Sequence, residues 1–192
     1  GIPAVSMDNN VEGLLHIGID NSTAMRDITE HFIKVHGFER INYISGPKDN
    51  PESADRLAAF LDVMRENEID IDESRIFYGD FRGNSGRDAI DYFMNSELEM
   101  PDAIICANDV MAVSAINRLY AAGIRVPEDI AVSGFDDVFD SNNLIVELTS
   151  VERPLVRSGT LACEMLLNTF NNTLKRKSLR LNMLPKYTES CG

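Results

Sequence analysis

The sequence predicts an α/β fold, a doubly wound parallel sheet with helices on both faces. Apolar runs of five to seven residues alternate along the chain with longer stretches of helical periodicity. The apolar runs are continuous and rich in β-branched residues, as strands buried on both faces are. Strand, helix and strand in succession form right-handed βαβ units, so the alternation favours a Rossmann-like or flavodoxin-like parallel sheet.

The strands are expected where these apolar runs lie. Each run is too short for a buried helix, and turn residues or charges border it. The expected strands are residues 3–7, 14–20, 41–45, 75–79, 103–107, 130–135 and 181–187.

The first two expected helices carry end signals. Residues 22–37 begin with Ser22 as a plausible N-cap and end at Gly37. Residues 50–67 begin with Asn50 as the N-cap and Pro51 in the first helical position. The expected apolar faces are Met25, Ile28, Phe32 and Val35 on the first helix, and Ala54, Leu57, Leu61 and Met64 on the second.

Three further helices complete the alternation. Residues 85–95 start at a capping Ser85, residues 109–123 close at Gly123, and residues 155–172 precede the last strand. No repeat, low-complexity tract or long linker interrupts the pattern.

Charge and hydropathy exclude two classes of partner. The net charge of −13 argues against nucleic-acid binding by this chain itself, because phosphate recognition needs a basic face. No run of 18 apolar residues is present, so we expect no membrane partner.

Catalytic and metal-binding signatures are also absent from the sequence. The three cysteines (Cys106, Cys163 and Cys191) lie far apart and are odd in number, which argues against a disulfide framework and a zinc site. The three histidines are scattered, and no nucleophile elbow or phosphate loop is found. We therefore expect a protein that is not an enzyme, with no cofactor and no metal, in a reducing compartment.

Polar side chains gather after the expected strands, where open parallel sheets bind ligands. Acidic, amide and aromatic residues together suit a small hydroxylated ligand. The residues concerned are Asp80, Phe81, Arg82, Asn108, Asp109, Phe135, Asp136 and Asp137.

Several of these residues have a purely structural alternative. Asn108 or Asp109 could only cap the following helix, and one acid of the pair at 136–137 could only bond backbone amides of its loop. Phe81 could be a core residue, and Arg56, near a helix start, an ordinary surface arginine. The residues alone leave these alternatives open.

The second half of the chain resembles a known family. The segments "PDAIICANDVMAVSAINRLYAAGIRVPEDIAVSGFDD", "LTSVERPL" and "LPKYTESCG" strongly resemble the effector-binding core of the lactose-repressor (LacI/GalR) family. The earlier segments "RINYISGP", "ADRLAAF" and "YGDFRGNSGRDA" fall in the family's order. The resemblance implies a type I periplasmic-binding-protein fold, with two lobes and an effector cleft between them.

The resemblance also implies roles for particular residues. It makes Asp136 an acid that bonds an effector hydroxyl, Arg56 the effector-clamping arginine, Asn108 an effector-contacting amide and Phe81 a stacking aromatic. The crossover residues His16 and Arg153 are expected to line the cleft. Asp109 and Asp137 are left mainly to capping and loop structure.

The family plan further implies an incomplete core. Residues 17–152 and 178–192 would form the C-terminal lobe, and residues 1–16 and 153–177 would be remnants of the N-terminal lobe. On the usual scale of such units, about 100 residues of the N-terminal lobe are missing from this chain. The helix at 155–171 would lose its sheet, so we expect it to be displaced, packed on a neighbouring chain or poorly ordered.

The implied function is allosteric sensing of a sugar or sugar-like effector by a cytoplasmic homodimer, which contacts DNA only through a helix-turn-helix domain outside this chain. The alternative is the sensor of a histidine kinase or diguanylate cyclase, since "VHGFERINYISGP" resembles the hybrid-sensor wording. Many family members have Gln where this chain has Arg153. Two cleft arginines would favour an anionic effector, although Arg153 could equally pair with Glu152 or point to solvent.

Overall fold

The computed structural model describes residues 2–139, 144–171, 173–174 and 177–192. The chain divides into two compact units. The large unit comprises Ser22–Glu152 and Leu184–Gly192, and the small unit comprises Gly1–Asn21 and Arg153–Met183. The family plan placed the boundaries between the lobes at 16/17 and 177/178. The structure instead includes the strands β2 (Leu15–Ile19) and β8 (Ser178–Leu181) in the small unit. The assignment of each unit to a lobe of a complete core stays a prediction.

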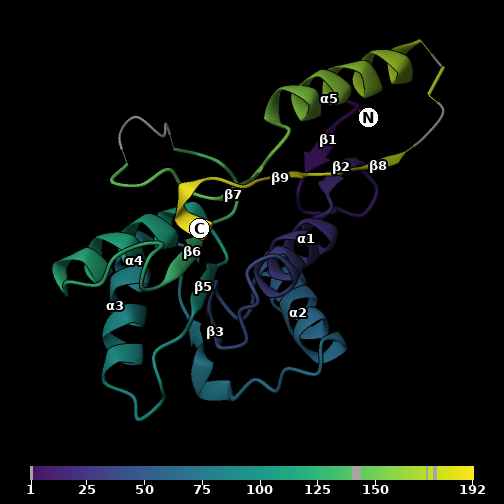
Figure 1. The fold of residues 1–192 in the computed structure, drawn as a ribbon. Coiled ribbons are helices and arrows are strands. Elements are labelled where there is room, and N and C mark those ends of the chain that lie inside the picture. Colours follow the sequence, from purple (N-terminus) through teal and green to yellow (C-terminus); the bar gives the residue numbers. More distant parts are fainter. Residues whose placement is uncertain (1, 140–143, 172, 175–176) are drawn as a thin grey trace. The chain divides into compact units, whose positions relative to one another are not determined.

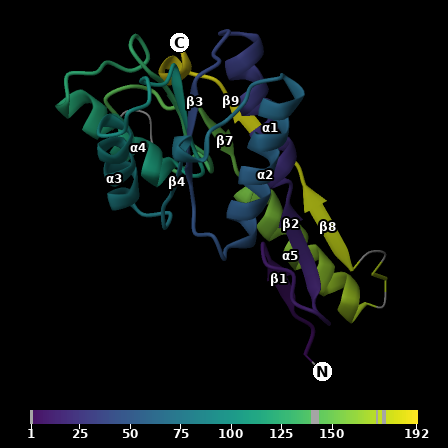
Figure 2. The ribbon, with the colours of Figure 1, turned by 90° about the horizontal axis from the view of Figure 1, so that it is seen from below.

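The large unit is built on a four-stranded parallel sheet in the order β4-β3-β5-β6. Figures 1 and 2 show helices α1 and α2 over one face of this sheet and α3 and α4 over the other. The expected alternation of parallel strands and helices is therefore confirmed. The element bounds are α1 (Asn21–Lys34), β3 (Ile41–Ser45), α2 (Pro51–Glu66), β4 (Ile76–Tyr78), α3 (Gly83–Met94), β5 (Ala103–Cys106), α4 (Asp109–Ala121) and β6 (Ala131–Ser133).

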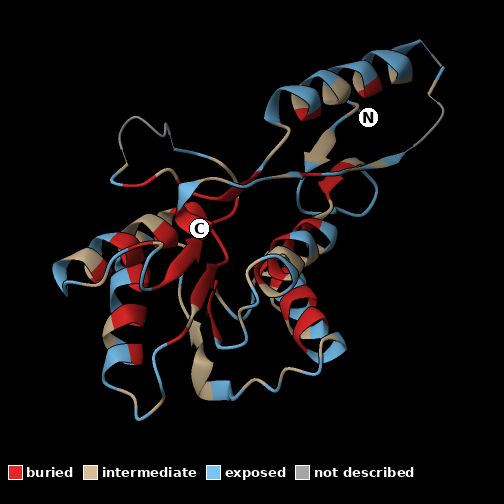
Figure 3. Ribbon diagram, in the orientation of Figure 1, coloured by how far each residue is buried: buried red, intermediate tan, exposed pale blue. Residues whose placement is uncertain are grey.

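Burial follows the two-faced sheet. Strands β3 and β5 are buried along their whole length, as the red central segments of Figure 3 show. Helices α3 and α4 approach each other closely at Gly86, where an added Cβ would lie 2.0 Å from the Met111 carbonyl oxygen. Glycine is the only residue that permits this approach without a shift of the backbone.

Short segments complete the large unit. Strands β7 (Ser150–Glu152) and β9 (Leu184–Lys186) pair antiparallel, and the short helices η1 (Glu73–Arg75) and η3 (Glu189–Cys191) flank the sheet. Ser190 in η3 donates its hydroxyl to the Val132 carbonyl at 2.6 Å and accepts from the Thr149 amide at 2.8 Å. The C-terminal segment is thereby attached to β6.

The small unit is a three-stranded parallel sheet in the order β1-β2-β8 with one helix. Its elements are β1 (Val5–Met7), β2 (Leu15–Ile19), α5 (Leu155–Phe170) and β8 (Ser178–Leu181). Helix α5 packs on β1 and β2, so its expected displacement is wrong, while packing on a neighbouring chain and poor order stay predictions. Asn172, the last residue of the expected helix, lies outside the described residues.

Some local predictions are wrong. Helix α1 begins before Ser22, and the N-cap of α3 is Arg82 rather than Ser85, whose hydroxyl donates to Asp80. Val35 is exposed, and helix α2 buries Ala59, Phe60 and Val63 rather than Ala54 and Leu61. The Asn50 cap is confirmed, since its side chain accepts from the Ser53 amide at 3.1 Å.

None of the helices in the described part of the chain combines the length and apolar character that a membrane crossing requires.

Candidate functional site

The carboxyl edge of the large unit's sheet carries four of the six predicted site residues. Arg56 lies in the second turn of α2, Phe81 follows β4, Asn108 follows β5 and Asp136 follows β6. Parallel strands end at one edge, which explains why residues so far apart in sequence meet there.

Arg56 is the centre of this edge. Its side chain is only 1% exposed, so the alternative of a surface arginine is wrong. One guanidinium nitrogen donates to the Ala107 carbonyl oxygen at 2.6 Å, and the other to Asp136 Oδ1 at 3.2 Å. The guanidinium carbon lies 4.0 Å from the centroid of the Phe135 ring. A buried cation needs such compensation, and here a carbonyl, a carboxylate and an aromatic face supply it.

A second carboxylate reaches the same guanidinium. Glu52 Oε2 lies 3.7 Å from an Arg56 terminal nitrogen, one helical turn earlier on α2. Two acids therefore face one buried cation from different elements.

Asp136 is held in an uncommon backbone conformation. Its φ is 98°, and the next residue, Asp137, has a φ of 48°. The Asp136 amide donates to the Val151 carbonyl oxygen at 3.0 Å, which ties the turn to β7. Two successive non-glycine residues with positive φ cost free energy, and such strain concentrates at binding sites. The strained turn presents the partly exposed Asp136 carboxylate to Arg56.

Asn108 is the N-cap of α4. Its Oδ1 accepts from the Met111 amide at 3.0 Å, and its Nδ2 donates to the Phe81 carbonyl at 3.0 Å. Asn108 therefore caps α4, and its expected contact with an effector stays a prediction. The amide nitrogen carries two N–H groups, so capping and the Phe81 contact do not exhaust its donors.

Phe81 is positioned by its own backbone and by Gly46. Its φ is 65°, and its ring lies where a Cβ at Gly46 would come within 2.3 Å. Since only glycine leaves room for the ring, the loop after β3 and the loop after β4 are fitted to each other. The ring is half-buried, so part of it remains accessible to a ligand.

Asp109 stabilises the turn at residues 136–138 through two hydrogen bonds. Its Oδ1 accepts from the Ser150 hydroxyl at 2.6 Å, and its Oδ2 from the Val138 amide at 2.8 Å. Burial raises the pKa of Asp109 to about 6, against the lowering by these two hydrogen bonds. A Cβ at Gly134 would lie 2.2 Å from Asp109 Oδ1, so glycine is required there. Asp109 therefore has a structural role in this loop, and Asn108 is the residue that caps α4.

A small hollow of the large unit lies where the ends of β3 and β4 meet α2. It has a volume of about 220 Å³ and is lined by Ser45, Lys48, Ser53, Ala54, Leu57 and Tyr78. The Lys48 ammonium lies 4.0 Å from the centroid of the Tyr78 ring. Hydroxyls, a cation and an aromatic face are the groups that recognise a hydroxylated ligand.

The remaining two predicted residues lie in the small unit. His16 contacts the Ser178 hydroxyl at 3.3 Å and the Asp8 carbonyl at 3.2 Å. Arg153 forms an ion pair with Asp8 Oδ1 at 2.8 Å. Arg153 therefore pairs with Asp8. It neither pairs with Glu152 alone nor points only to solvent, the two alternatives considered from the sequence. Their role beside the four large-unit residues stays a prediction.

The sequence reasoning missed two contributors. Glu52 lies four residues before Arg56, a spacing that places both on one helix face and could have shown the pair. Asp8 has no comparable signal, because it meets Arg153 only through the fold of the small unit.

Comparison with known proteins identifies the protein family of this chain. A family model described as a periplasmic binding protein-like domain matches residues 29–190. The chain therefore belongs to the periplasmic binding protein-like domain family.

The relatives narrow this class. The chain is 32% identical to the HTH-type transcriptional repressor PurR of Klebsiella pneumoniae over 171 residues, which are 89% of this chain and 50% of that protein. It is 32% identical to the ribose operon repressor of Escherichia coli over 182 residues, 94% of this chain and 55% of that protein. A solved transcriptional regulator CelR–cellobiose complex superposes with a TM-score of 0.83 at 29% identity, covering 97% of this chain and 58% of that one.

The chain is thus the periplasmic binding protein-like, effector-binding type of domain found in LacI-family regulators. It spans about half the length of the curated relatives it matches. These relatives are transcriptional repressors rather than enzymes.

Proposed function

We propose that this chain senses a small hydroxylated effector, a sugar or a sugar-like metabolite, as part of a LacI-type transcriptional regulator. The observation that carries the proposal is the buried Arg56 guanidinium, which Asp136 and the Ala107 carbonyl hold at the carboxyl edge of the sheet. A carboxylate accepts hydrogen bonds from effector hydroxyls, and a guanidinium donates hydrogen bonds to effector oxygens. The pair can therefore bond both hydroxyl groups of a diol.

Four large-unit residues have proposed contacts with the effector. Asp136 and Arg56 supply the polar contacts, Phe81 offers its ring face to the apolar side of a sugar, and Asn108 donates an N–H. His16 and Arg153 of the small unit are proposed as further contacts. Asp8 already neutralises part of the Arg153 charge, which weakens the case for an anionic effector.

The output is proposed to be control of DNA binding. The effector can shift an equilibrium between two states of the regulator only by the difference in its affinity for them. We propose a cytoplasmic homodimer whose helix-turn-helix domain, outside this chain, contacts the operator. The matched relatives are repressors, which favours this output over a sensor for a histidine kinase or diguanylate cyclase.

The test is a ligand screen on the native polypeptide. Thermal unfolding is followed with pentoses including ribose, disaccharides including cellobiose, and hexose phosphates. We expect one class to raise the unfolding temperature, because a ligand that binds only the folded state stabilises it.

Arg56→Lys, which loses the planar fork, should abolish the shift. The matched control Arg118→Lys, at a surface ion pair with Asp91, should retain it. A shift of equal size in both variants would contradict the assigned site, and no shift with any sugar or sugar phosphate would contradict the proposed effector class.

A further inference from the structure

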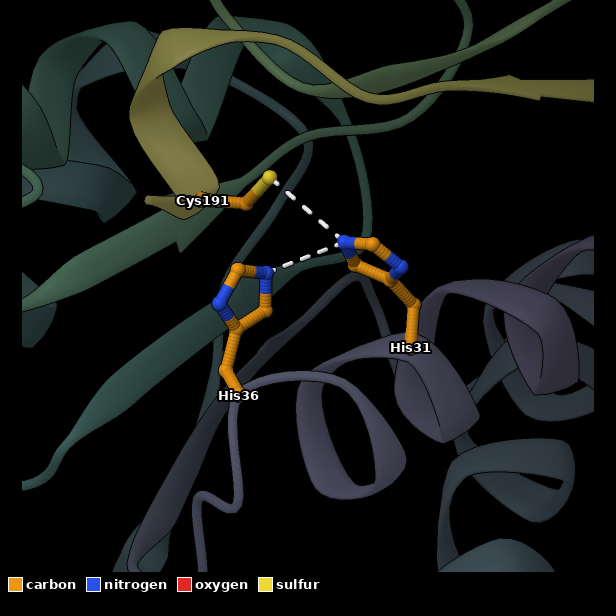
Figure 4. A group of neighbouring side chains, drawn as sticks. All are labelled: His31, His36 and Cys191. Atoms are coloured by element: carbon orange, nitrogen blue, oxygen red, sulfur yellow. Dashed lines mark hydrogen bonds between the residues drawn. The ribbon is translucent and has the colours of Figure 1, made fainter.

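Three metal-ligating side chains that are scattered in sequence meet in the large unit. His31 lies near the end of α1, His36 follows that helix, and Cys191 lies in η3. The Nε2 atoms of His31 and His36 are 3.0 Å apart, and Cys191 Sγ is 3.7 Å from His31 Nε2. Figure 4 shows the three side chains pointing toward one another, and their ligand atoms all lie within 4.8 Å of each other.

We propose that His31, His36 and Cys191 form a binding site for a borderline-soft divalent cation of the zinc class. The site is separate from the edge that carries Arg56 and Asp136. The sequence does not predict this site, because His31, His36 and Cys191 are separated by 5 and 155 residues and match no spacing of a zinc motif.

Two of the three distances between ligand atoms fit tetrahedral coordination, and the third pair, His36 and Cys191, lies within 4.8 Å. Zinc binds imidazole nitrogen at about 2.0 Å and thiolate sulfur at about 2.3 Å, which sets nitrogen–nitrogen edges near ~3.3 Å and nitrogen–sulfur edges near ~3.5 Å. The observed separations of 3.0 and 3.7 Å differ from these edges by a few tenths of an ångström. Three protein ligands leave the fourth position to water.

The surroundings hold the imidazole planes in place. The Tyr187 ring stacks on His31 with centroids 3.8 Å apart, and the Phe38 ring stacks on His36 at 5.3 Å. The Tyr187 hydroxyl donates to the Asp27 carbonyl at 3.3 Å, which fixes that ring in turn. A set of ligands oriented in advance binds a metal with less loss of conformational entropy.

The donor set selects the class of metal. Two imidazoles and one thiol suit zinc and other late transition metals, whereas magnesium and calcium require oxygen ligands. Cys191 is buried and both histidines are half-buried, so the site is partly shielded from water.

Metal binding requires a small proton rearrangement. The Cys191 thiol now donates to the Thr188 carbonyl at 3.2 Å, and one histidine Nε2 donates to the other. On binding, the thiol releases its proton to solvent. The imidazole that donated from Nε2 changes tautomer, so that its proton lies on Nδ1 and Nε2 is free to bind the metal. The bound metal would join the end of α1 to η3, which Ser190 already attaches to β6.

The test uses the native polypeptide prepared without a histidine tag. Cobalt(II) replaces zinc as a probe, because thiolate coordination produces a charge-transfer absorption band. We expect one equivalent of cobalt to bind, with that band, and zinc to displace it. Cys191→Ser should abolish the band and weaken binding at least ~100-fold, more than the loss of an outer-shell partner. The matched control Cys163→Ser, at an exposed cysteine of the small unit, should change neither.

Three results would overturn the site, two from cobalt binding and one from X-ray absorption. Cobalt binding without a thiolate band, or a band that survives Cys191→Ser and is lost in Cys163→Ser, would exclude Cys191 as a ligand. Serine can keep the hydrogen bond to Thr188, so the variant should fold. X-ray absorption at the zinc edge of the unmodified protein needs no variant at all. We expect one sulfur and two imidazoles, and an all-oxygen shell would contradict the proposal.

Discussion

At the scale of single residues, the molecule is most constrained around Arg56. A fully buried guanidinium is tolerated because three different groups compensate it: the Asp136 carboxylate, the Ala107 carbonyl and the Phe135 ring. Removing one partner of a buried pair leaves an uncompensated charge, which costs far more than the pair itself contributes. The same arrangement is what a polar effector would use.

Replacing Arg56 by methionine should destabilise the large unit strongly. The change leaves the Asp136 carboxylate and the Ala107 carbonyl without their donor, and we expect a loss of about 3–5 kcal/mol in the free energy of unfolding. Urea unfolding followed by circular dichroism measures it.

Arg118→Met provides the comparison, because its ion pair with Asp91 is a surface one and should contribute less than ~1 kcal/mol. Equal losses in the two variants would show that the Arg56 pair has no special energetic role.

Asp109 should make stability depend on pH. Its folded-state pKa of about 6 is above its ordinary value, so the folded state binds the proton more tightly than the unfolded state. Its contribution is therefore greatest in acid, falls as the pH rises from about 4 to about 6, and is constant above that. Over this window the change is up to roughly 3 kcal/mol.

The measurement is the free energy of unfolding of wild type minus that of Asp109→Asn, from pH 4 to pH 7.5. The subtraction cancels the other titrating groups. We expect this difference to fall as the pH rises through the window. A difference that rises instead would mean that hydrogen bonding, and not burial, dominates the environment of Asp109.

At the scale of elements, α5 presents two unlike faces. Met165 is buried against its own unit, whereas Val156 is 86% exposed, and Leu155, Leu167 and Phe170 are also exposed. Among the described residues, the buried side of the helix packs on strands β1 and β2.

Truncations on the two faces should therefore differ. Met165→Ala should lower the free energy of unfolding of the small unit by about 2–3 kcal/mol, since it opens a cavity. Val156→Ser should change it by less than ~0.5 kcal/mol. Hydrogen exchange of the α5 amides reports on this unit directly. Similar loss of protection in both variants would indicate that the exposed face is packed in solution.

The helices and the long strands could be predicted because their apolar periodicity is strong. Strands β7 and β8 could not, because neither has a continuous apolar run. The one apolar residue of β7 lies between Ser150 and Glu152, and β8 alternates exposed polar with half-buried apolar residues. The meeting of Arg56 and Asp136 followed from the rule for parallel sheets together with the resemblance. Glu52 could have been inferred from its i, i+4 spacing to Arg56, whereas Asp8 and the cluster of His31, His36 and Cys191 depend on tertiary contacts that leave no spacing in the sequence.

At the scale of the whole molecule, the chain joins a nearly self-contained large unit to a small unit built from two distant segments. The chain spans about half the length of the curated relatives it matches, so a response to effector by the whole regulator stays a proposal. The part of the site that the large unit carries can be tested independently of that response.

The most direct test compares two neighbouring acids in the native polypeptide by isothermal titration, with the sugar or sugar phosphate that the thermal screen selects. Asp136 is proposed to bond the effector, whereas the Asp137 amide donates to the Ser150 hydroxyl of β7 and the Asp137 carboxylate faces Lys186. We predict that Asp136→Asn weakens affinity about 10–100-fold, the effect of losing one charge-assisted hydrogen bond of about 1.5–3 kcal/mol. Asp137→Asn should change affinity less than about threefold, by the same conversion of free energy to affinity. Full affinity in Asp136→Asn, with a loss in Asp137→Asn, would contradict the assignment of the effector site.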